Sequence, residues 1–220
     1  MRRFRTCNIP KNARGAAVAI GNFDGVHLGH QAIIDIARLQ AQKISAPLGI
    51  LTFEPHPRSF FSKKLDKDFL PFRLMNANAR FHRLEKLGVD LLLEIPFNQA
   101  LCELSDWEFS KKILNDSFGL SHVVVGSDFC FGKDRGGTAQ SLENHAAKLG
   151  FGLTIATMKN HEDKVISSTN IRQALTEANP QKAAAMLGHW HRIEATVEHG
   201  EKRGRELGFP TVNITIAGLQ

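Results

Sequence analysis

The sequence contains few cysteines and no apolar run that approaches the length of a membrane span. Its longest apolar segments, such as residues 89–97, have the length of strands. The basic residues 1–15 lack the apolar core of a signal peptide. Cys7, Cys102 and Cys130 are odd in number and have no paired spacing, which favours a reducing compartment over a disulfide framework or a zinc site. We therefore predict a cytoplasmic protein without a membrane partner.

The common phosphate-binding and nucleophile motifs are also missing. The sequence has no GxxxxGK[ST] segment, which excludes a P-loop kinase, and no GxGxxG follows an apolar run. It has no GxSxG nucleophile elbow either. The net charge of +6 is scattered along the chain rather than gathered in one block. Because an enzyme for polyphosphate substrates shows the same bias, we expect no nucleic acid partner.

Strand-like and helix-like segments alternate along the first three quarters of the chain. Apolar runs predict strands at residues 16–21, 47–53, 89–97, 121–126 and 152–157, and helical spacing predicts helices at 30–42, 73–88, 105–114 and 138–150. Residues 54–72 are rich in proline and aromatic residues and are predicted to be irregular. This order predicts the α/β class, with a Rossmann-like parallel sheet and right-handed crossovers. A ligand would bind beyond the carboxyl ends of the strands.

The character of the sequence changes near its C-terminus. Residues 192–216 alternate apolar and polar side chains around glycine turns, a pattern typical of β-hairpins. So few strands cannot close a core. We therefore predict one domain over residues 1–185 and the incomplete start of a β-barrel-type domain over residues 186–220. His189, His191 and His199 are expected to be surface residues of this second part.

The most unusual stretch, GNFDGVHLGH at residues 21–30, directly follows the first predicted strand. A glycine there lets the backbone approach a phosphate, and the start of the next helix offers free amides and a positive dipole. His27 and His30 share a helix face, so their rings could hold a phosphate whose charge rises in a transition state. The absence of HExxH spacing and of a third ligand disfavours zinc. The pattern predicts a site that positions phosphates without a covalent intermediate.

Five segments, in order, carry a resemblance to a known family. GxFDxxHxGH is similar to the signature of the HxGH nucleotidyltransferases, and the fuller GNFDGVHLGHQ resembles one branch, the prokaryotic bifunctional FAD synthetases. The segments TFEPHPRSFF (52–61), VVVGSDFCFG (123–132) and ISSTNIR (166–172) resemble further motifs of that branch, and GRELGFPTVNI (204–214) resembles the opening of its riboflavin kinase module. Family members often carry a basic residue just before ISSTxIR, where this sequence has Lys164 and Val165.

The resemblance implies adenylyl transfer from ATP, bound with Mg²⁺, to FMN, which gives FAD and pyrophosphate. In such a reaction the FMN phosphate attacks the α-phosphorus in line, and the enzyme mainly positions and neutralises the phosphates. We expect His27, His30 and Arg172 to be catalytic, with His30 at the transition state and Arg172 at the β- and γ-phosphates. Asp24 is expected to brace its loop. The expected ATP-binding residues are Gly21, Phe23, Asp24, Gly29, Ser167, Ser168 and Thr169.

The loops after the second and fourth strands are expected to bind the flavin. Proline-stiffened apolar walls suit a flat ring, and either Arg58 or His56 could meet the FMN phosphate. The expected FMN-binding residues are Phe53, Pro55, His56, Pro57, Arg58 and Asp128, whereas Phe129 and Phe131 are assigned to the core.

In the tail, Thr211 and Asn213 match the Mg·ATP-binding residues of the kinase module. Since most of that barrel is missing from the sequence, we expect no kinase activity. Two alternatives remain open. The same fold could adenylylate nicotinamide mononucleotide, phosphopantetheine or a sugar phosphate, or the protein could be a non-catalytic flavin or nucleotide carrier.

Overall fold

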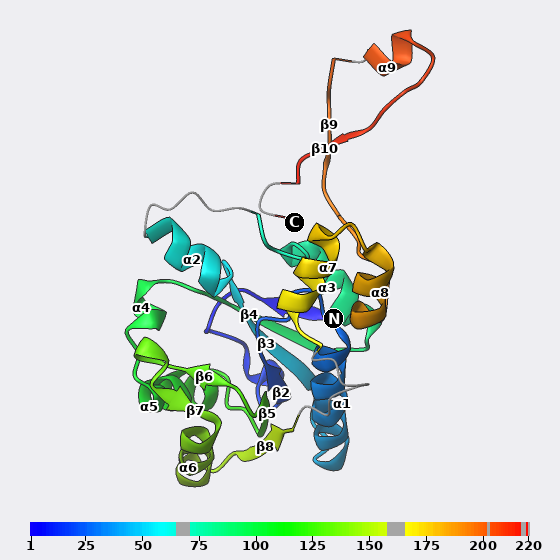
Figure 1. The fold of residues 1–220 in the computed structure, drawn as a ribbon. Coiled ribbons are helices and arrows are strands. Elements are labelled where there is room, and N and C mark those ends of the chain that lie inside the picture. The colour runs from blue at the N-terminus through cyan, green and yellow to red at the C-terminus, as the bar shows by residue number, and fades with distance from the viewer. Residues whose placement is uncertain (65–70, 158–165, 202, 217–218, 220) are drawn as a thin grey trace.

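The computed structural model describes residues 1–64, 71–157, 166–201, 203–216 and 219, within which a parallel sheet forms the centre (Figure 1). Its six strands are ordered β1-β4-β3-β2-β5-β8, and every neighbouring pair is parallel. The strands are β1 (Arg2–Phe4), β2 (Ala17–Ile20), β3 (Leu48–Glu54), β4 (Leu91–Pro96), β5 (His122–Gly126) and β8 (Gly152–Ala156). The predicted α/β class and its five strands are confirmed. The edge strand β1, short and basic, was not predicted.

Helices cover both faces of the sheet, because alternate strand residues point to opposite sides. One face packs against α1 (Leu28–Lys43) and α3 (Ala77–Lys86). The other packs against the π-helical segment η2 (Phe109–Ser117), which continues the short helix α5 (Asp106–Glu108), and against α6 (Ala139–Leu149). Ser105 and Glu108 form the capping box that their spacing predicts.

A third, smaller cluster lies at the carboxyl edge of the sheet. It joins α7 (Ser168–Thr176) and α8 (Pro180–Leu187) to Leu74, through the buried side chains Ile171, Ala174, Ala183 and Leu187. Helix α8 includes residue 185, the predicted domain boundary, which stays a prediction. The remaining short elements are η1 (Lys11–Ala13), α4 (Gln99–Cys102), β6 (Cys130–Phe131), η3 (Lys133–Arg135) and β7 (Gly137–Thr138).

The prediction that residues 54–72 are irregular was wrong in part. Helix α2 occupies Pro57–Lys64, and residues 65–70 lie outside the described chain. Pro57 is its first residue, where the missing N–H breaks no helical hydrogen bond, so the proline starts the helix instead of preventing it.

The C-terminal residues form an arm that projects from the body (Figure 1). Its strands β9 (Val197–Glu198) and β10 (Asn213–Ile214) pair antiparallel, and the short helix α9 (Arg203–Glu206) lies between them in sequence. Large apolar side chains on the arm are exposed, Phe209 to 78%. The predicted hairpin is present. None of the described helices combines the length and apolar character that a membrane crossing requires.

Candidate active site

Residues 21–30, which we call the glycine–histidine turn, link the carboxyl end of β2 to the start of α1. The backbone takes positive φ at Phe23 (49°), Gly25 (87°) and Val26 (43°). For a β-branched residue such as Val26 this conformation is unusual, and strain of this kind costs about 1–3 kcal/mol per residue. Phe23, Gly25 and Val26 are all buried. The turn therefore keeps its shape only because its surroundings hold it.

His27 and His30 form a stacked pair at the N-terminus of α1. Their ring centroids are 3.6 Å apart at an interplanar angle of 16°. Nδ1 of His27 accepts a hydrogen bond from the backbone N–H of His30 at 3.2 Å, so the proton of a neutral His27 ring is on Nε2. Nδ1 of His30 is buried and has no hydrogen-bond partner among the residues that the structure describes. His27 thus offers an Nε2–H donor, and His30 a buried Nδ1 without a hydrogen-bond partner among the described residues.

Burial keeps both rings neutral at pH 7. Together with the positive charge of Arg172, it lowers the pKa of His27 to about 4. Burial, and then the neighbouring His27, hold the pKa of His30 well below its ordinary value. The histidines therefore present neutral donors and acceptors in the free protein, not the fixed positive charge of a lysine.

Asp24 links the turn to two other segments of the chain. Its Oδ1 accepts hydrogen bonds from the backbone N–H groups of Leu74 (3.0 Å) and Met75 (3.3 Å), and its Oδ2 forms an ion pair with Nη2 of Arg172 at 2.7 Å. Its carbonyl oxygen accepts a hydrogen bond from Oγ of Ser168 at 2.9 Å. The carboxylate is 3% exposed. Asp24 thus joins the turn to the segment before α3 and to α7.

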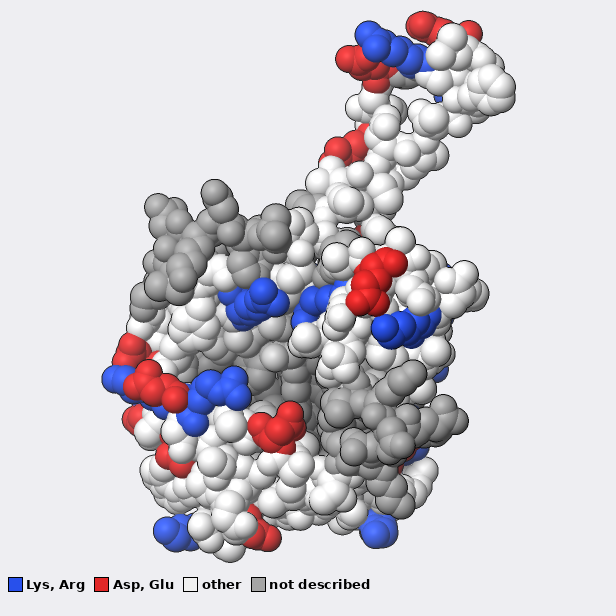
Figure 2. All heavy atoms as spheres, in the orientation of Figure 1, with Lys and Arg blue, Asp and Glu red and all other residues white. Residues whose placement is uncertain are grey.

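A cavity of about 930 Å³ opens beside the turn. It is bounded by the turn, the ends of β3 and β4, helix α2, the loop after β5 and the start of α7. These are mostly segments that follow the carboxyl ends of parallel strands, where ligands bind in open α/β sheets. Over the face drawn in Figure 2, acidic and basic side chains are interspersed.

An ion-pair network that the sequence did not reveal supports the turn from the sheet. Arg80 is 1% exposed, and its Nη2 meets Glu94 at 2.7 Å and Glu54 at 2.9 Å. Its Nη1 donates to the carbonyl oxygen of Asn22 in the turn at 3.3 Å. Burial alone would raise the pKa of Glu94, but the hydrogen bonds and charges of Arg80 and Arg3 outweigh it and lower the pKa. The network fixes Asn22 relative to β3 and β4.

Comparisons with known proteins identify the family of the chain. Residues 9–170 match the family model described as FAD synthetase. The chain belongs to the FAD synthetase family. Residues 187–219 match the riboflavin kinase model.

The similarity to known relatives extends over nearly all of the chain. It is 39% identical over 209 residues to the bifunctional riboflavin kinase/FMN adenylyltransferase of Pseudomonas fluorescens, covering 95% of this chain and 66% of the relative. It is 34% identical to the protein of that name from Escherichia coli K12, covering 92% and 63%. A crystal structure titled as a macrolide-efflux protein from Streptococcus pneumoniae matches with a TM-score of 0.78 and 29% identity, over 98% of this chain and 69% of that one. The chain thus spans about two thirds of the length of these proteins.

The structure brings most of the predicted site residues to the cavity. The predicted residues that line it are Gly21, His27, His30, Phe53, His56, Pro57, Arg58, Asp128, Ser167 and Ser168. The predicted residues outside its lining are Phe23, Asp24, Gly29, Pro55, Thr169 and Arg172. Arg172 instead contacts Asp24 and donates from Nε to the carbonyl oxygen of Phe72 at 2.6 Å. Lys164 and Val165 lie outside the described residues.

His56 occupies the expected flavin side and is 8% exposed. Its Nδ1 accepts from the backbone N–H of Arg58 at 3.1 Å, which leaves Nε2 as the donor of the neutral ring. Burial lowers its pKa to about 4. Two lining residues that the sequence analysis missed, Phe61 and Phe97, pack edge to face at 5.8 Å. Phe97 directly follows β4, so the rule on the carboxyl ends of strands could have found it.

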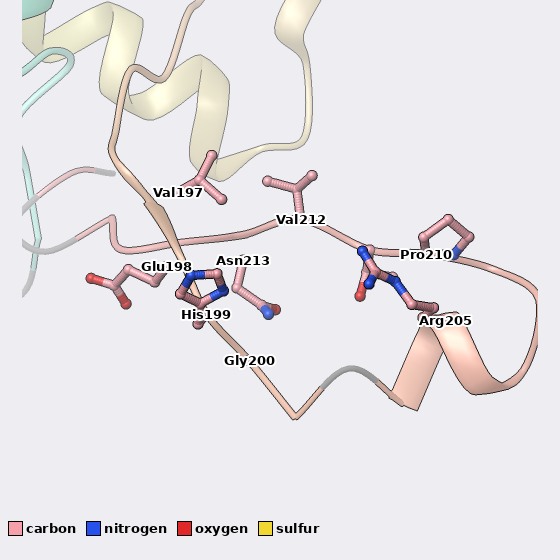
Figure 3. A pocket seen from close by; sticks show the side chains of 9 residues that line it. Val197, Glu198, His199, Gly200, Arg205, Pro210, Val212 and Asn213 are labelled. Carbon is pink, nitrogen blue, oxygen red and sulfur yellow. The ribbon is translucent and has the colours of Figure 1, made fainter.

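The predicted kinase residues Thr211 and Asn213 line a separate cavity of about 320 Å³ in the arm. Figure 3 shows that Val197 to Gly200 come from one side of the arm and Pro210 to Asn213 from the other. Of the three histidines expected at the surface of the second part, His199 is exposed. His189 and His191 are half-buried, and their rings meet backbone carbonyl oxygens of the body at Gly25 and Leu74.

Proposed function

We propose that this protein is an FMN adenylyltransferase, which converts ATP and FMN to FAD and pyrophosphate. The observation that carries the proposal is the cavity that joins the stacked His27–His30 pair to an aromatic pocket with Phe53 and Phe97. Family membership and the names of the relatives support the same reaction. The phosphate side and the ring side of one nucleotide would thus be served by one continuous cavity.

In this reaction an oxygen of the FMN phosphate forms a bond to the α-phosphorus of ATP. The bond between the α-phosphorus and the bridging oxygen to the β-phosphate breaks, and pyrophosphate leaves with that oxygen. Negative charge grows on the leaving group, so donors fixed in place before reaction lower the barrier. ATP would arrive as its Mg²⁺ complex. Among the described residues there is no group of three or more His, Cys, Asp or Glu side chains that could hold a metal ion.

We assign the α-phosphate contact to His27 and His30. His27 offers the Nε2–H donor that its hydrogen bond to the His30 amide leaves free for the ligand. Ser167 and Ser168 line the same cavity, and the backbone amides at the start of α7 suit the other phosphates. The Ser168 hydroxyl donates to the carbonyl oxygen of Asp24, so we assign it to holding the turn. Because Arg172 pairs with Asp24, we assign it first to positioning the turn. To contact the β- and γ-phosphates as well, Arg172 would have to bind them while it keeps its ion pair with Asp24.

We assign the flavin ring to the aromatic side of the cavity. Phe53 and Phe97 meet edge to face at 5.8 Å, and helix α2 adds Phe61. His56 and Arg58 lie at the start of that helix and suit the FMN phosphate. Asp128 is exposed at the cavity and could accept hydrogen bonds from the ring.

The three free thiols, Cys7, Cys102 and Cys130, support a cytoplasmic reaction.

The test is adenylylation of alternative acceptors. The protein is incubated with ATP and Mg²⁺ and with FMN, nicotinamide mononucleotide or phosphopantetheine, and pyrophosphate release is measured for each. We expect release with FMN only, together with quenching of flavin fluorescence as FAD forms. Release with another acceptor but not with FMN would favour the first alternative. Flavin binding without release from any acceptor would favour a carrier.

A variant locates the chemistry in the turn. His30→Ala should lower kcat about 10²-fold or more, since one preorganised donor is worth that much in comparable sites. His122→Ala is the matched control, because this half-buried histidine bonds Thr154 at the opposite end of the sheet. Equal rates for the two variants would show that the turn is not where reaction occurs.

A further inference from the structure

Residues 187–194, which we call the strap, run from the end of α8 across the back of the glycine–histidine turn. Nε2 of His189 lies 3.1 Å from the carbonyl oxygen of Gly25, and Nε2 of His191 lies 3.0 Å from that of Leu74. Farther along, the carbonyl oxygen of Glu194 accepts from Nδ2 of Asn76 at 2.5 Å. Nδ1 of His189 faces a second carbonyl oxygen, that of Trp190, at 2.8 Å. Because a carbonyl oxygen only accepts and a neutral imidazole carries one N–H, we assign the His189 proton to Nε2, toward Gly25, and Nε2 of His191 donates to Leu74.

The strap also begins with a close packing contact. A Cβ on Gly25 would lie 2.8 Å from Cδ1 of Leu74 and 3.1 Å from Cδ2 of Leu187, so the turn fits tightly between these two leucines. Nε2 of Gln31 donates to the carbonyl oxygens of both Val26 and Leu187, each at 2.9 Å. The turn is thus fastened to the strap by hydrogen bonds and by packing.

These contacts fall on the strained part of the turn. Positive φ occurs at Gly25 and Val26, and the two carbonyl oxygens of these residues are the ones held by His189 and Gln31. The next residue is His27. A strained backbone persists only where its surroundings over-determine it. Release of either carbonyl would let the peptide planes rotate and would move the first histidine ring.

We propose that the strap is a positioning element for the adenylyl transfer and that His189 is its key residue. His189 touches no substrate; it acts through Gly25 on the orientation of His27 and His30. This role rests on the proposed function. The match to the riboflavin kinase model begins at residue 187, so His189 lies in the region that resembles the kinase. The first residues of the kinase-like region would serve the active site of the other module.

The test compares three variants of the full chain. His189→Ala removes the donor to Gly25, and His189→Gln replaces it with an amide N–H of similar reach. His122→Ala is the control, since it removes one histidine hydrogen bond, to Thr154, far from the turn. For each variant, kcat and the KM values for ATP and FMN are measured, together with amide hydrogen exchange in the peptide that spans residues 21–31.

We expect His189→Ala to lower kcat about tenfold with KM values within about twofold, because misplacement affects the transition state more than substrate binding. Exchange in residues 21–31 should become about tenfold faster. His189→Gln should recover most of both losses, and His122→Ala should change neither. Unchanged kcat and unchanged exchange in His189→Ala would overturn the proposal, as would a loss of kcat that His189→Gln does not recover.

Exchange also separates the two proposals. If the wild-type protein forms no FAD but His189→Ala still loosens residues 21–31, the proposed function fails while the strap still holds the turn. If FAD forms and exchange in the turn does not respond to His189→Ala, the proposed function stands and the strap proposal fails.

Discussion

Removal of the Asp24 carboxylate should release the whole site, and its cost can be worked out from the contacts. Asp24→Ala leaves two backbone N–H groups, those of Leu74 and Met75, without the acceptor that Asp24 supplies. It also removes the ion pair with Arg172, whose hydrogen bond to the Phe72 carbonyl oxygen remains. Loss of one partner from a buried pair costs about 3–5 kcal/mol. Arg172 keeps 16% of its side chain exposed, which reduces its share. We therefore expect the free energy of unfolding to fall by about 4 kcal/mol.

Asp24→Asn separates the charge from the hydrogen bonds. The amide oxygen can still accept from Leu74 and Met75, so only the ion pair with Arg172 is lost. We expect a smaller decrease of about 2 kcal/mol. Urea unfolding measures both variants. Asp35→Ala, at an exposed position on α1 with a surface partner, is the control and should stay within about 0.5 kcal/mol of wild type.

A double-mutant cycle with Arg172→Met then gives the coupling between the two side chains. We expect about 2 kcal/mol, because the partners are in direct contact. A coupling near zero, or an Asp24→Ala protein as stable as the Asp35→Ala control, would refute the argument that Asp24 holds the turn through Arg172.

Two further predictions concern crowding and protonation. Gly25→Ala should destabilise the protein by about 3 kcal/mol, because the new methyl group would crowd Leu74 and Leu187. Gly150→Ala is the control, since Gly150 also has positive φ but open space around the new methyl group, and it should cost only about 1 kcal/mol. Equal losses in thermal unfolding would mean that crowding at Gly25 is unimportant. Burial lowers the pKa of His27 and His56 to about 4, so between pH 6.5 and pH 4 the unfolded chain binds more protons than the folded one. Stability should therefore be full well above pH 6.5 and fall by about 2 kcal/mol for each ring, or about 4 kcal/mol in all, by pH 5. His56→Gln should reduce that fall, and a pH-independent unfolding free energy would contradict the burial of both rings.

Much of the fold follows from local patterns in the sequence. Apolar runs such as residues 121–126 and glycine stops such as Gly150 determine strands and helix ends within a few residues. The sequence does not predict strand β1, because its three residues, Arg2 to Phe4, form a strand only through pairing with β4. The sequence does not predict helix α2, because proline usually interrupts a helix, whereas Pro57 occupies the first position of this one.

The site was predictable where its residues sit in one motif, and hidden where partners are far apart in sequence. The glycines and histidines of residues 21–30 predict a phosphate-binding turn, and Ser167 predicts the start of α7. Nothing local in the sequence shows that Arg80 reaches Asn22, or that His189 reaches Gly25 across 164 positions. Those contacts depend on how α3 and α8 pack, which is decided by tertiary structure. A lone histidine in a tail has no periodicity to mark it.

The central claim, adenylyl transfer to FMN, is tested most directly by following the phosphorus atoms. The protein is incubated with FMN, Mg²⁺ and ATP labelled at either the α- or the γ-phosphate, and the products are separated. We predict that the α-label appears in FAD and the γ-label in pyrophosphate. The γ-label in a flavin product, or the α-label retained in AMP or ADP without FAD, would contradict the account.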